Sequence, residues 1–228
     1  MSKHLSKEEL QTDPLLENVA KATTFFNENR TIILAVLIGV VVVVGSLIGY
    51  TYYSSSQEQQ AQELLAIAEG YYSEGDFDRA LNGDSFELTY GFLAIANDFS
   101  GTEAGNLANY YASVSSFKLG NIEDALSQFE RYDAPNGILG VGSISFYASI
   151  LKENGSLEKA AETYVEAAEW DENDFTSPYN LLEAAKIYYD LGNYEVAQEL
   201  ADRIIKEYPT SSEATESLRL EGMISASI

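Results

Sequence analysis

The sequence predicts an all-α protein in which a single N-terminal transmembrane helix precedes an α-solenoid of about four helical hairpins and a C-terminal capping helix. Three features lead to this prediction: an uncharged apolar run of 20 residues, a turn motif that occurs four times, and a polar helical segment after the last motif. Motifs that recur every 20 to 50 residues are typical of chains that stack helical hairpins side by side.

The apolar run extends from Thr31 to Tyr50 and contains no charged residue. At about 1.5 Å of rise per residue, a helix of this length spans roughly 30 Å, which is the thickness of a bilayer's hydrocarbon core. A buried core helix is usually shorter and has a polar face, and a cleaved signal peptide has a shorter charged segment before its apolar run. We therefore expect residues 31–50 to form a permanent single-pass anchor.

Basic residues near the anchor predict its orientation. Lys21 and Arg30 lie just before the apolar run, whereas the first Lys or Arg after it is Arg79. Because positively charged flanks stay in the cytoplasm, residues 1–30 should be cytoplasmic and the 178 residues after Tyr50 should lie in the periplasm or another extracytoplasmic space.

The cytoplasmic segment should contain a short amphipathic helix. Asp13 can cap this helix and Pro14 can occupy its first turn. One face would then carry Leu15, Val19, Ala22 and Phe26. Such a face lies either on the inner leaflet or against a partner protein, and the small number of positive charges slightly favours the partner.

Charge and composition exclude several functions. The chain after Tyr50 carries 9 basic and 31 acidic side chains, a net charge of −22, which repels nucleic acids and anionic lipids. Cysteine is absent, so disulfides and thiolate metal sites are excluded, and the single histidine, His4, lies in a polar tail. Ser149 and Lys152 match a Ser-x-x-Lys pattern only on a predicted repeat helix. We expect no enzyme activity, no cofactor, no metal and no small-molecule substrate.

The repeated motif has the form G-[DNS]-apolar-[DE]-x-A. Glycine can adopt the left-handed conformation that ends a helix, the next residue can cap the following helix, and the acidic residue favours that helix's positive end. A small residue recurs seven positions before each glycine, so paired small residues should let the two helices approach closely. The glycines are Gly75, Gly120, Gly155 and Gly192, the closing alanines are Ala80, Ala125, Ala160 and Ala197, and the earlier small residues are Ala68, Ser113, Ala148 and Ala185.

These positions resemble the tetratricopeptide repeat (TPR), a 34-residue helical hairpin. The second repeat keeps the glycine and closing alanine but has Ser113 and Ser116 where alanine and tyrosine are usual. The best match is the last repeat, through Ala185, Tyr188, Gly192, Tyr194, Ala197 and Pro209.

Spacings between the motif glycines locate an insertion. They are 45, 35 and 37 residues, so the first interval holds about eleven extra residues, which we place near residues 82–90. Ser55 and Glu58 form a capping-box pattern that would begin the solenoid, and the predicted solenoid covers residues 55–210. Residues 134–143 should connect two repeats, and residues 211–228 should form the terminal cap, opened by Ser211 or Ser212 with Leu218 and Met223 as its apolar residues.

The first helix of each hairpin should line a concave face. Counting back from the motif glycines assigns five aromatic residues to this face, and aromatic surfaces suit loose recognition of extended apolar polypeptides. The alternative is that each ring packs between neighbouring repeats or against the terminal helix. The five residues are Tyr72, Tyr110, Phe117, Tyr179 and Tyr189.

The combination of a short cytoplasmic segment, one anchor and an external four-hairpin domain resembles the YfgM-like family, the ancillary subunits of the bacterial SecYEG translocon. The most similar stretch is NGDSFELTYGFLAIANDFSGTEAGNLANYYA. This resemblance implies a location in the bacterial inner membrane, association with SecYEG and a PpiD-type chaperone, and a role in handing over unfolded secretory proteins. The alternative is a structural or assembly subunit of another membrane complex.

Overall fold

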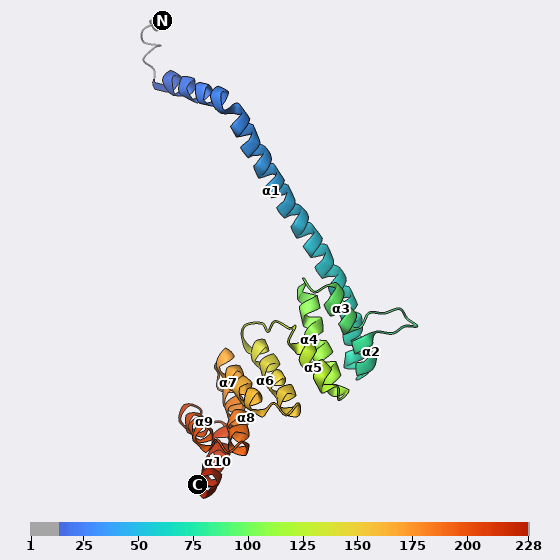
Figure 1. Ribbon diagram of the computed structural model, residues 1–228, viewed down its shortest axis with the longest axis vertical. Helices are drawn as coiled ribbons and strands as arrows, with labels where there is room; N and C mark the ends of the chain where they lie inside the picture. Colours follow the sequence, from blue (N-terminus) through green and yellow to red (C-terminus); the bar gives the residue numbers. More distant parts are fainter. Residues whose placement is uncertain (1–13, 228) are drawn as a thin grey trace, which may run out of the picture. The chain divides into compact units, whose positions relative to one another are not determined.

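The computed structural model describes residues 14–227, which contain ten α-helices and no strand (Figure 1). The chain divides into two compact units, Met1–Ser56 and Gln57–Ile228. Helix α1 (Pro14–Ser73) contributes to both units. Pro14 is its first residue, as expected for a proline in the first turn, whereas His4 and the predicted cap Asp13 lie outside the described residues.

The first unit consists of the N-terminal part of α1. This part is long and apolar enough to be a candidate membrane span, and none of the side chains in its apolar window is buried. The structure corrects the prediction of a separate amphipathic helix before the anchor, because α1 continues without a break from Pro14. No proline interrupts this stretch after Pro14, and an ion pair between Lys21 and Glu17 (2.7 Å) supports the turns before the apolar run.

The structure also corrects the predicted capping box. Ser55 and Glu58 lie inside α1, so no helix begins there. Glu58 instead accepts hydrogen bonds from the backbone N–H groups of Glu103 (2.7 Å) and Ala104 (3.2 Å). These N–H groups have no partner within their own helix, and a carboxylate also favours the positive helix end. Glu58 therefore joins repeat one to the start of repeat two.

Helical hairpins build the second unit. Repeat one pairs the end of α1 with α2 (Phe77–Asn82) and is completed by α3 (Phe92–Asp98). The next hairpin is α4 (Glu103–Lys118) with α5 (Ile122–Phe129), followed by α6 (Ile138–Glu153) with α7 (Leu157–Trp170) and α8 (Thr176–Asp190) with α9 (Tyr194–Glu207). Helix α10 (Ser212–Ser227) packs against α9 and α8.

All four motif turns share one backbone geometry. Gly75, Gly120, Gly155 and Gly192 have φ between +75° and +82°, in the left-handed region. In the last turn, Gly192 N–H donates to the carbonyl of Tyr189 (2.9 Å) and Asn193 N–H to that of Tyr188 (2.9 Å); the other three turns repeat this pattern. This is the Schellman motif, which satisfies carbonyls at the end of the first helix.

The capping prediction holds for one turn and is wrong for three. Asp76 accepts a hydrogen bond from Arg79 N–H (3.1 Å), and an ion pair with the Arg79 guanidinium (2.8 Å) holds its carboxylate there. At the other turns, Asn121, Ser156 and Asn193 make no side-chain cap, because no ion pair fixes their side chains over the next helix.

Small residues lie in the cores of the hairpins, as predicted. The four closing alanines and the four earlier small residues are completely buried. In repeat two, Ser113 Oγ donates a 2.8 Å hydrogen bond to the carbonyl oxygen of Ala125, which confirms that these two positions meet. Serine therefore replaces alanine without leaving its hydroxyl unpaired.

One segment boundary and the buried residues of the terminal helix differ from the prediction. The connector after repeat two ends at Gly137, and Gly140, which we had placed in the connector, lies in α6. A Cβ at Gly140 would collide with the carbonyl of Pro135 and the indole of Trp170, so only glycine fits there. Within α10, Leu220 and Ile224 are buried, whereas Leu218 and Met223 are exposed.

Candidate functional site

The structure separates the five aromatic residues predicted to line one groove. Tyr72 packs against Phe92 of repeat one and Tyr111 of α4, and Tyr189 lies against Tyr194, with its hydroxyl 3.3 Å from Ser227 Oγ on the terminal helix. Tyr179 is 48% exposed. Tyr110 and Phe117 come together because both rings contact Phe146, and Tyr111 lies between Tyr110 and Tyr72 in edge contact with both rings.

A cluster of six aromatic side chains lies where repeats two and three meet, and we call it the junction cluster. It includes Phe146, which counting back from the motif glycine Gly155 does not assign to the concave face. The count selects Ser145, one position earlier. Its members are Tyr110, Phe117, Phe129, Tyr132, Phe146 and Tyr147.

Ring geometry shows that these side chains form one continuous aromatic surface. Phe129 and Tyr147 stack with centroids 4.6 Å apart and ring planes at 5°. Phe146 contacts Tyr110 edge-on at 6.0 Å and Phe117 at 5.4 Å. Phe129 is buried, and the other five rings are partly buried.

The short helix α5 explains why the rings gather here. It ends at Phe129 after 8 residues, whereas α7 and α9 have 14 residues each. Tyr132 follows in the connector, and rings from α4 and α6 fill the space beside it. Aromatic pairs contribute about 0.5–1.5 kcal/mol each beyond the area they bury, so the cluster joins the two repeats.

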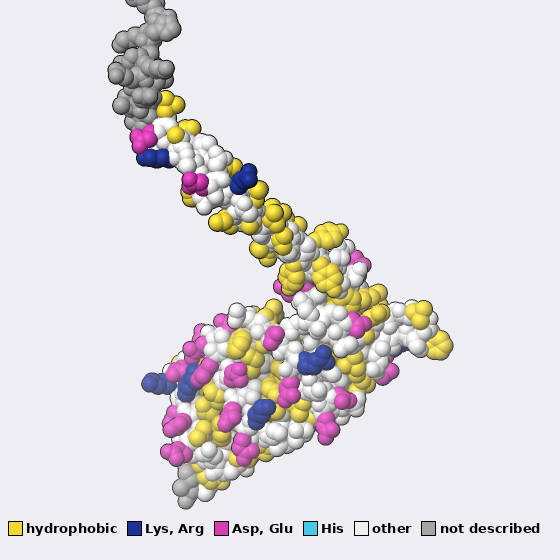
Figure 2. All heavy atoms as spheres, turned by 45° about the horizontal axis from the view of Figure 1, so that its top comes forward, with side chains coloured by type: hydrophobic (Ala, Val, Ile, Leu, Met, Phe, Trp, Pro, Cys, Tyr) yellow, Lys and Arg dark blue, Asp and Glu magenta, His cyan; other side chains and the backbone are white. Residues whose placement is uncertain are grey.

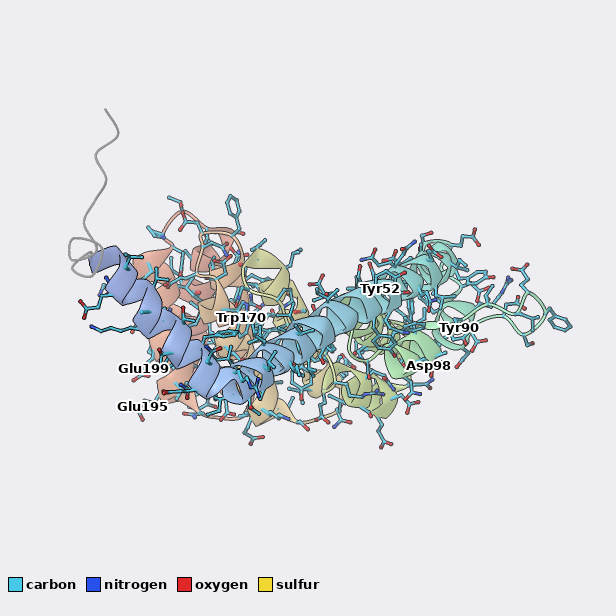
Figure 3. All side chains as sticks on the ribbon, turned by 90° about the horizontal axis from the view of Figure 1, so that it is seen from above. Tyr52, Tyr90, Asp98, Trp170, Glu195 and Glu199 are labelled. Atoms are coloured by element: carbon cyan, nitrogen blue, oxygen red, sulfur yellow. The ribbon has the colours of Figure 1, made fainter. Side chains whose placement is uncertain are left out.

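A cleft of about 230 Å³ opens beside the junction cluster. Its apolar lining includes Phe129, Tyr147 and Trp170, and Glu130 and Glu166 add two carboxylates. The Trp170 indole N–H donates to the Pro135 carbonyl at 3.0 Å, which fixes the ring on repeat three (Figure 3). Sites for drug-sized molecules usually exceed about 300 Å³, so this cleft suits one or two side chains of a polypeptide.

Three tyrosines at this surface, Tyr110, Tyr111 and Tyr132, remain uncharged at neutral pH. Burial raises the pKa of Tyr110, with smaller effects from Tyr72 and Tyr132, and burial also raises the pKa of Tyr132. Burial and the nearby charge of Glu69 raise the pKa of Tyr111 to about 12. The rings therefore offer apolar faces and neutral hydroxyl groups.

The Ser149 and Lys152 pair does not have the geometry of a nucleophile and its base. Ser149 Oγ donates to the Ser145 carbonyl (3.1 Å) and lies 2.9 Å from the Tyr164 hydroxyl. Burial lowers the pKa of Lys152, but the charge and hydrogen bond of Glu183, 3.3 Å away, with smaller effects from Tyr164 and Tyr179, together raise it. A general base needs the opposite shift, so Lys152 acts here as a link between α6 and α8.

Acidic side chains spread over the visible face of the solenoid, with few basic ones between them (Figure 2). Within residues 14–227, no group of three or more His, Asp or Glu side chains is placed to hold a metal ion. The carboxylates therefore act as a diffuse negative surface around the aromatic rings.

Comparisons with known proteins agree with the fold. A tetratricopeptide repeat family model matches residues 179–211. A structure of a tetratricopeptide repeat protein from Parabacteroides merdae is similar with a TM-score of 0.59 and 18% identity, over 74% of this chain and 61% of that one. The chain thus spans less than two thirds of that protein.

Two structures of a putative kinesin light chain from Podosopora anserina, with nearly identical TPR-like repeats, are similar with TM-scores of 0.53 and identities of 12% and 13%. Each similarity covers 73% of this chain, and the two cover 88% and 89% of the kinesin light chain structures. No curated protein sequence matches the chain. The second unit is therefore a TPR-like solenoid, a fold that generally serves as a non-catalytic scaffold for protein–protein interaction.

Proposed function

We propose that this protein is a membrane-tethered scaffold that binds extended segments of other proteins, and that the junction cluster is its binding surface. The observation that carries the proposal is a cluster of six contacting aromatic rings, one buried and five partly exposed, on an acidic solenoid. Aromatic side chains supply large contact areas at a small cost in conformational entropy and dominate many protein interfaces.

The chemistry of the junction cluster suggests which polypeptides it binds. Its rings and the adjoining cleft favour apolar side chains, and Glu130 and Glu166 favour Lys or Arg beside them. Because the cleft holds only one or two side chains, the ligand is best described as an extended chain that presents its residues in turn. Newly secreted proteins expose such segments before they fold.

The apolar part of α1 supports the tether. Its length and composition suit one membrane crossing, and the basic residues Lys21 and Arg30 favour a cytoplasmic N-terminus and a periplasmic solenoid. Together with the resemblance to the YfgM-like family, this leads us to infer that the protein is an ancillary subunit of the SecYEG translocon. It would act with a PpiD-type chaperone to hand over unfolded secretory proteins at the bacterial inner membrane.

The binding surface is tested with the full-length protein in detergent and a fluorescent unfolded peptide that alternates leucine with aromatic residues and carries flanking lysines. Replacing Tyr110, Phe117 and Phe146 together by alanine should weaken binding at least tenfold. Tyr179→Ala, which removes an exposed ring elsewhere, is the matched control and should bind normally. Binding by the triple variant equal to that of the wild-type protein, with an unchanged circular dichroism spectrum, would refute the proposal.

The translocon assignment competes with a structural or assembly role in another membrane complex. Purification in mild detergent followed by mass spectrometry separates the two. Recovery of SecY and the PpiD-type chaperone supports the translocon role. Recovery of one unrelated complex in fixed stoichiometry, without SecY, supports the structural role instead.

A further inference from the structure

The insertion between α2 and α3 presents apolar side chains to solvent, and we call residues 83–91 the anchor loop. It extends away from the helices of repeat one (Figure 1). Phe86 is 96% exposed and Leu88 is 84% exposed. Single exposed apolar residues are common. Here two large apolar side chains at one projecting turn make almost no contacts, so they do not stabilise the folded chain.

Backbone contacts close the neck of the anchor loop. Gly83 has φ of +82°, and a Cβ there would collide with the carbonyl of Thr89. A Cβ at Gly91 would collide with the backbone of Gly83 and with the carbonyl of Leu81. The two ends of the loop are therefore held together at a distance that only glycine permits.

Hydrogen bonds from Asp84 fix the tip. Its Oδ1 accepts from the N–H groups of Phe86 (2.7 Å) and Glu87 (3.2 Å), as in an Asx turn. Thr89 N–H donates to the Asp84 carbonyl (3.0 Å), and Asp84 N–H donates to Thr89 Oγ1 (2.9 Å). Residues 84–89 thus form a closed turn.

Side chains of repeat one hold this turn in place. Tyr71 donates a 2.8 Å hydrogen bond to Glu87 Oε2, and the Arg79 guanidinium lies 3.6 Å from Asp84 Oδ2 and over the Tyr71 ring. Leu88 has φ of +55°, an unfavourable region for a branched side chain that persists only where surrounding contacts impose it. The chain therefore maintains a strained turn with two apolar side chains directed outward.

We propose that the anchor loop inserts Phe86 and Leu88 into an apolar pocket with a basic rim on a folded partner protein. Asp84 and Glu87 are the only charged residues of the loop, and because Asp84 faces Arg79 while Glu87 is exposed, a basic rim is complementary to Glu87. The same charges, with the net charge of −22 after Tyr50, disfavour both an anionic lipid surface and a second copy of this chain. A preorganised turn suits a preformed pocket because little ordering is needed on binding.

The anchor loop belongs to repeat one, and the junction cluster belongs to repeats two and three. Figure 3 shows Tyr90, a residue of the loop, and Trp170 in a different part of the solenoid. The inference goes beyond the proposed function, since a folded partner held by the loop leaves the junction cluster free. Loss of peptide binding at the junction cluster would leave this proposal standing.

Site-specific photo-crosslinking of the full-length protein in its native membranes is the first test. A photoreactive phenylalanine analogue at position 86 should form one discrete protein adduct. The same analogue at Phe175, a matched residue that is 86% exposed, should not give that adduct. Adducts with phospholipid, adducts with a second copy, or no adduct at position 86 would each overturn the proposal.

The captured protein is then purified and its affinity measured with variants. Phe86→Ser combined with Leu88→Ser should lower affinity at least about 100-fold, as expected for two central anchors, and Glu87→Lys should lower it about tenfold. Phe175→Ser should leave affinity unchanged, and all variants should keep the wild-type circular dichroism spectrum. An affinity within twofold of wild type for the double variant, or tighter binding by Glu87→Lys, would refute the proposal.

Discussion

Replacing Gly192 by alanine tests whether the left-handed motif turns determine the fold of the hairpins. Gly192 has φ of +75°, and a Cβ there would have no heavy atom within 4 Å. Steric collision is thus excluded, and the cost is the backbone strain of a left-handed L-residue, about 1–2 kcal/mol of unfolding free energy. The Schellman hydrogen bonds allow no other conformation at this position without being broken.

Gly222 provides a control with the same chemical change. It lies inside α10 in ordinary helical conformation, and a Cβ there also meets no atom within 4 Å. Alanine at this position should stabilise the protein by about 0.5–1 kcal/mol, because glycine loses more entropy on folding. One substitution should therefore have opposite signs at two equally open positions.

The assay is urea denaturation of the full-length protein in detergent, followed by helical circular dichroism. Gly192→Ala should shift the midpoint to lower urea and Gly222→Ala to higher urea, with similar slopes. Equal shifts of the same sign would refute the reasoning, because they would show that the backbone conformation at Gly192 carries no special cost.

Three further predictions follow from other contacts. Phe129→Ala should cost about 3–5 kcal/mol in urea denaturation, because a buried ring of the junction cluster is removed; a loss below 1 kcal/mol would show that the rings do not join the repeats. The backbone N–H groups of Phe86 and Glu87 hold the pKa of Asp84 below its usual 3.8. Protection of these amides from hydrogen exchange, measured relative to their intrinsic rates, should therefore be complete above pH 3.8 and be lost as pH falls through the lowered pKa; protection without this dependence would contradict the prediction. Burial, with a smaller effect from Glu69, raises the pKa of Tyr111 to about 12. The stabilisation of the fold by un-ionised Tyr111 should therefore be complete below pH 10 and be lost as pH rises through about 12. Ultraviolet titration of wild type and Tyr111→Phe measures the pKa of Tyr111, and a difference spectrum that titrates near pH 10 would contradict the prediction.

Features that depend on local sequence could be predicted. Each motif turn needs glycine at a left-handed position, and each hairpin needs small residues where its helices cross, so both appear in the sequence at fixed spacing. The insertion was found near residues 82–90 because it changed that spacing, and the structure has α2 ending at Asn82 and α3 starting at Phe92.

Features that depend on long-range contacts could not be predicted in the same way. The Ser55 and Glu58 pattern has the form of a capping box, but α1 continues through both residues. The Glu58 carboxylate instead accepts a hydrogen bond from the backbone N–H of Glu103, 45 residues later in the chain. Phe146 was missed because ideal repeat positions ignore the early end of α5, which alters the packing between repeats two and three. Three of the four predicted caps did not form, because only Asp76 has an ion-pair partner, Arg79, that holds its side chain over the next helix.

Photo-crosslinking in intact, secreting cells tests the central claim most directly. A photoreactive phenylalanine analogue replaces Phe146 in one strain and Tyr179 in another, and newly made proteins are labelled briefly before irradiation. We predict that position 146 forms adducts with secretory polypeptides, that these disappear as the polypeptides fold, and that position 179 forms few. Equal labelling at the two positions, or none at position 146, would contradict the assignment of the junction cluster as a binding surface for extended polypeptides.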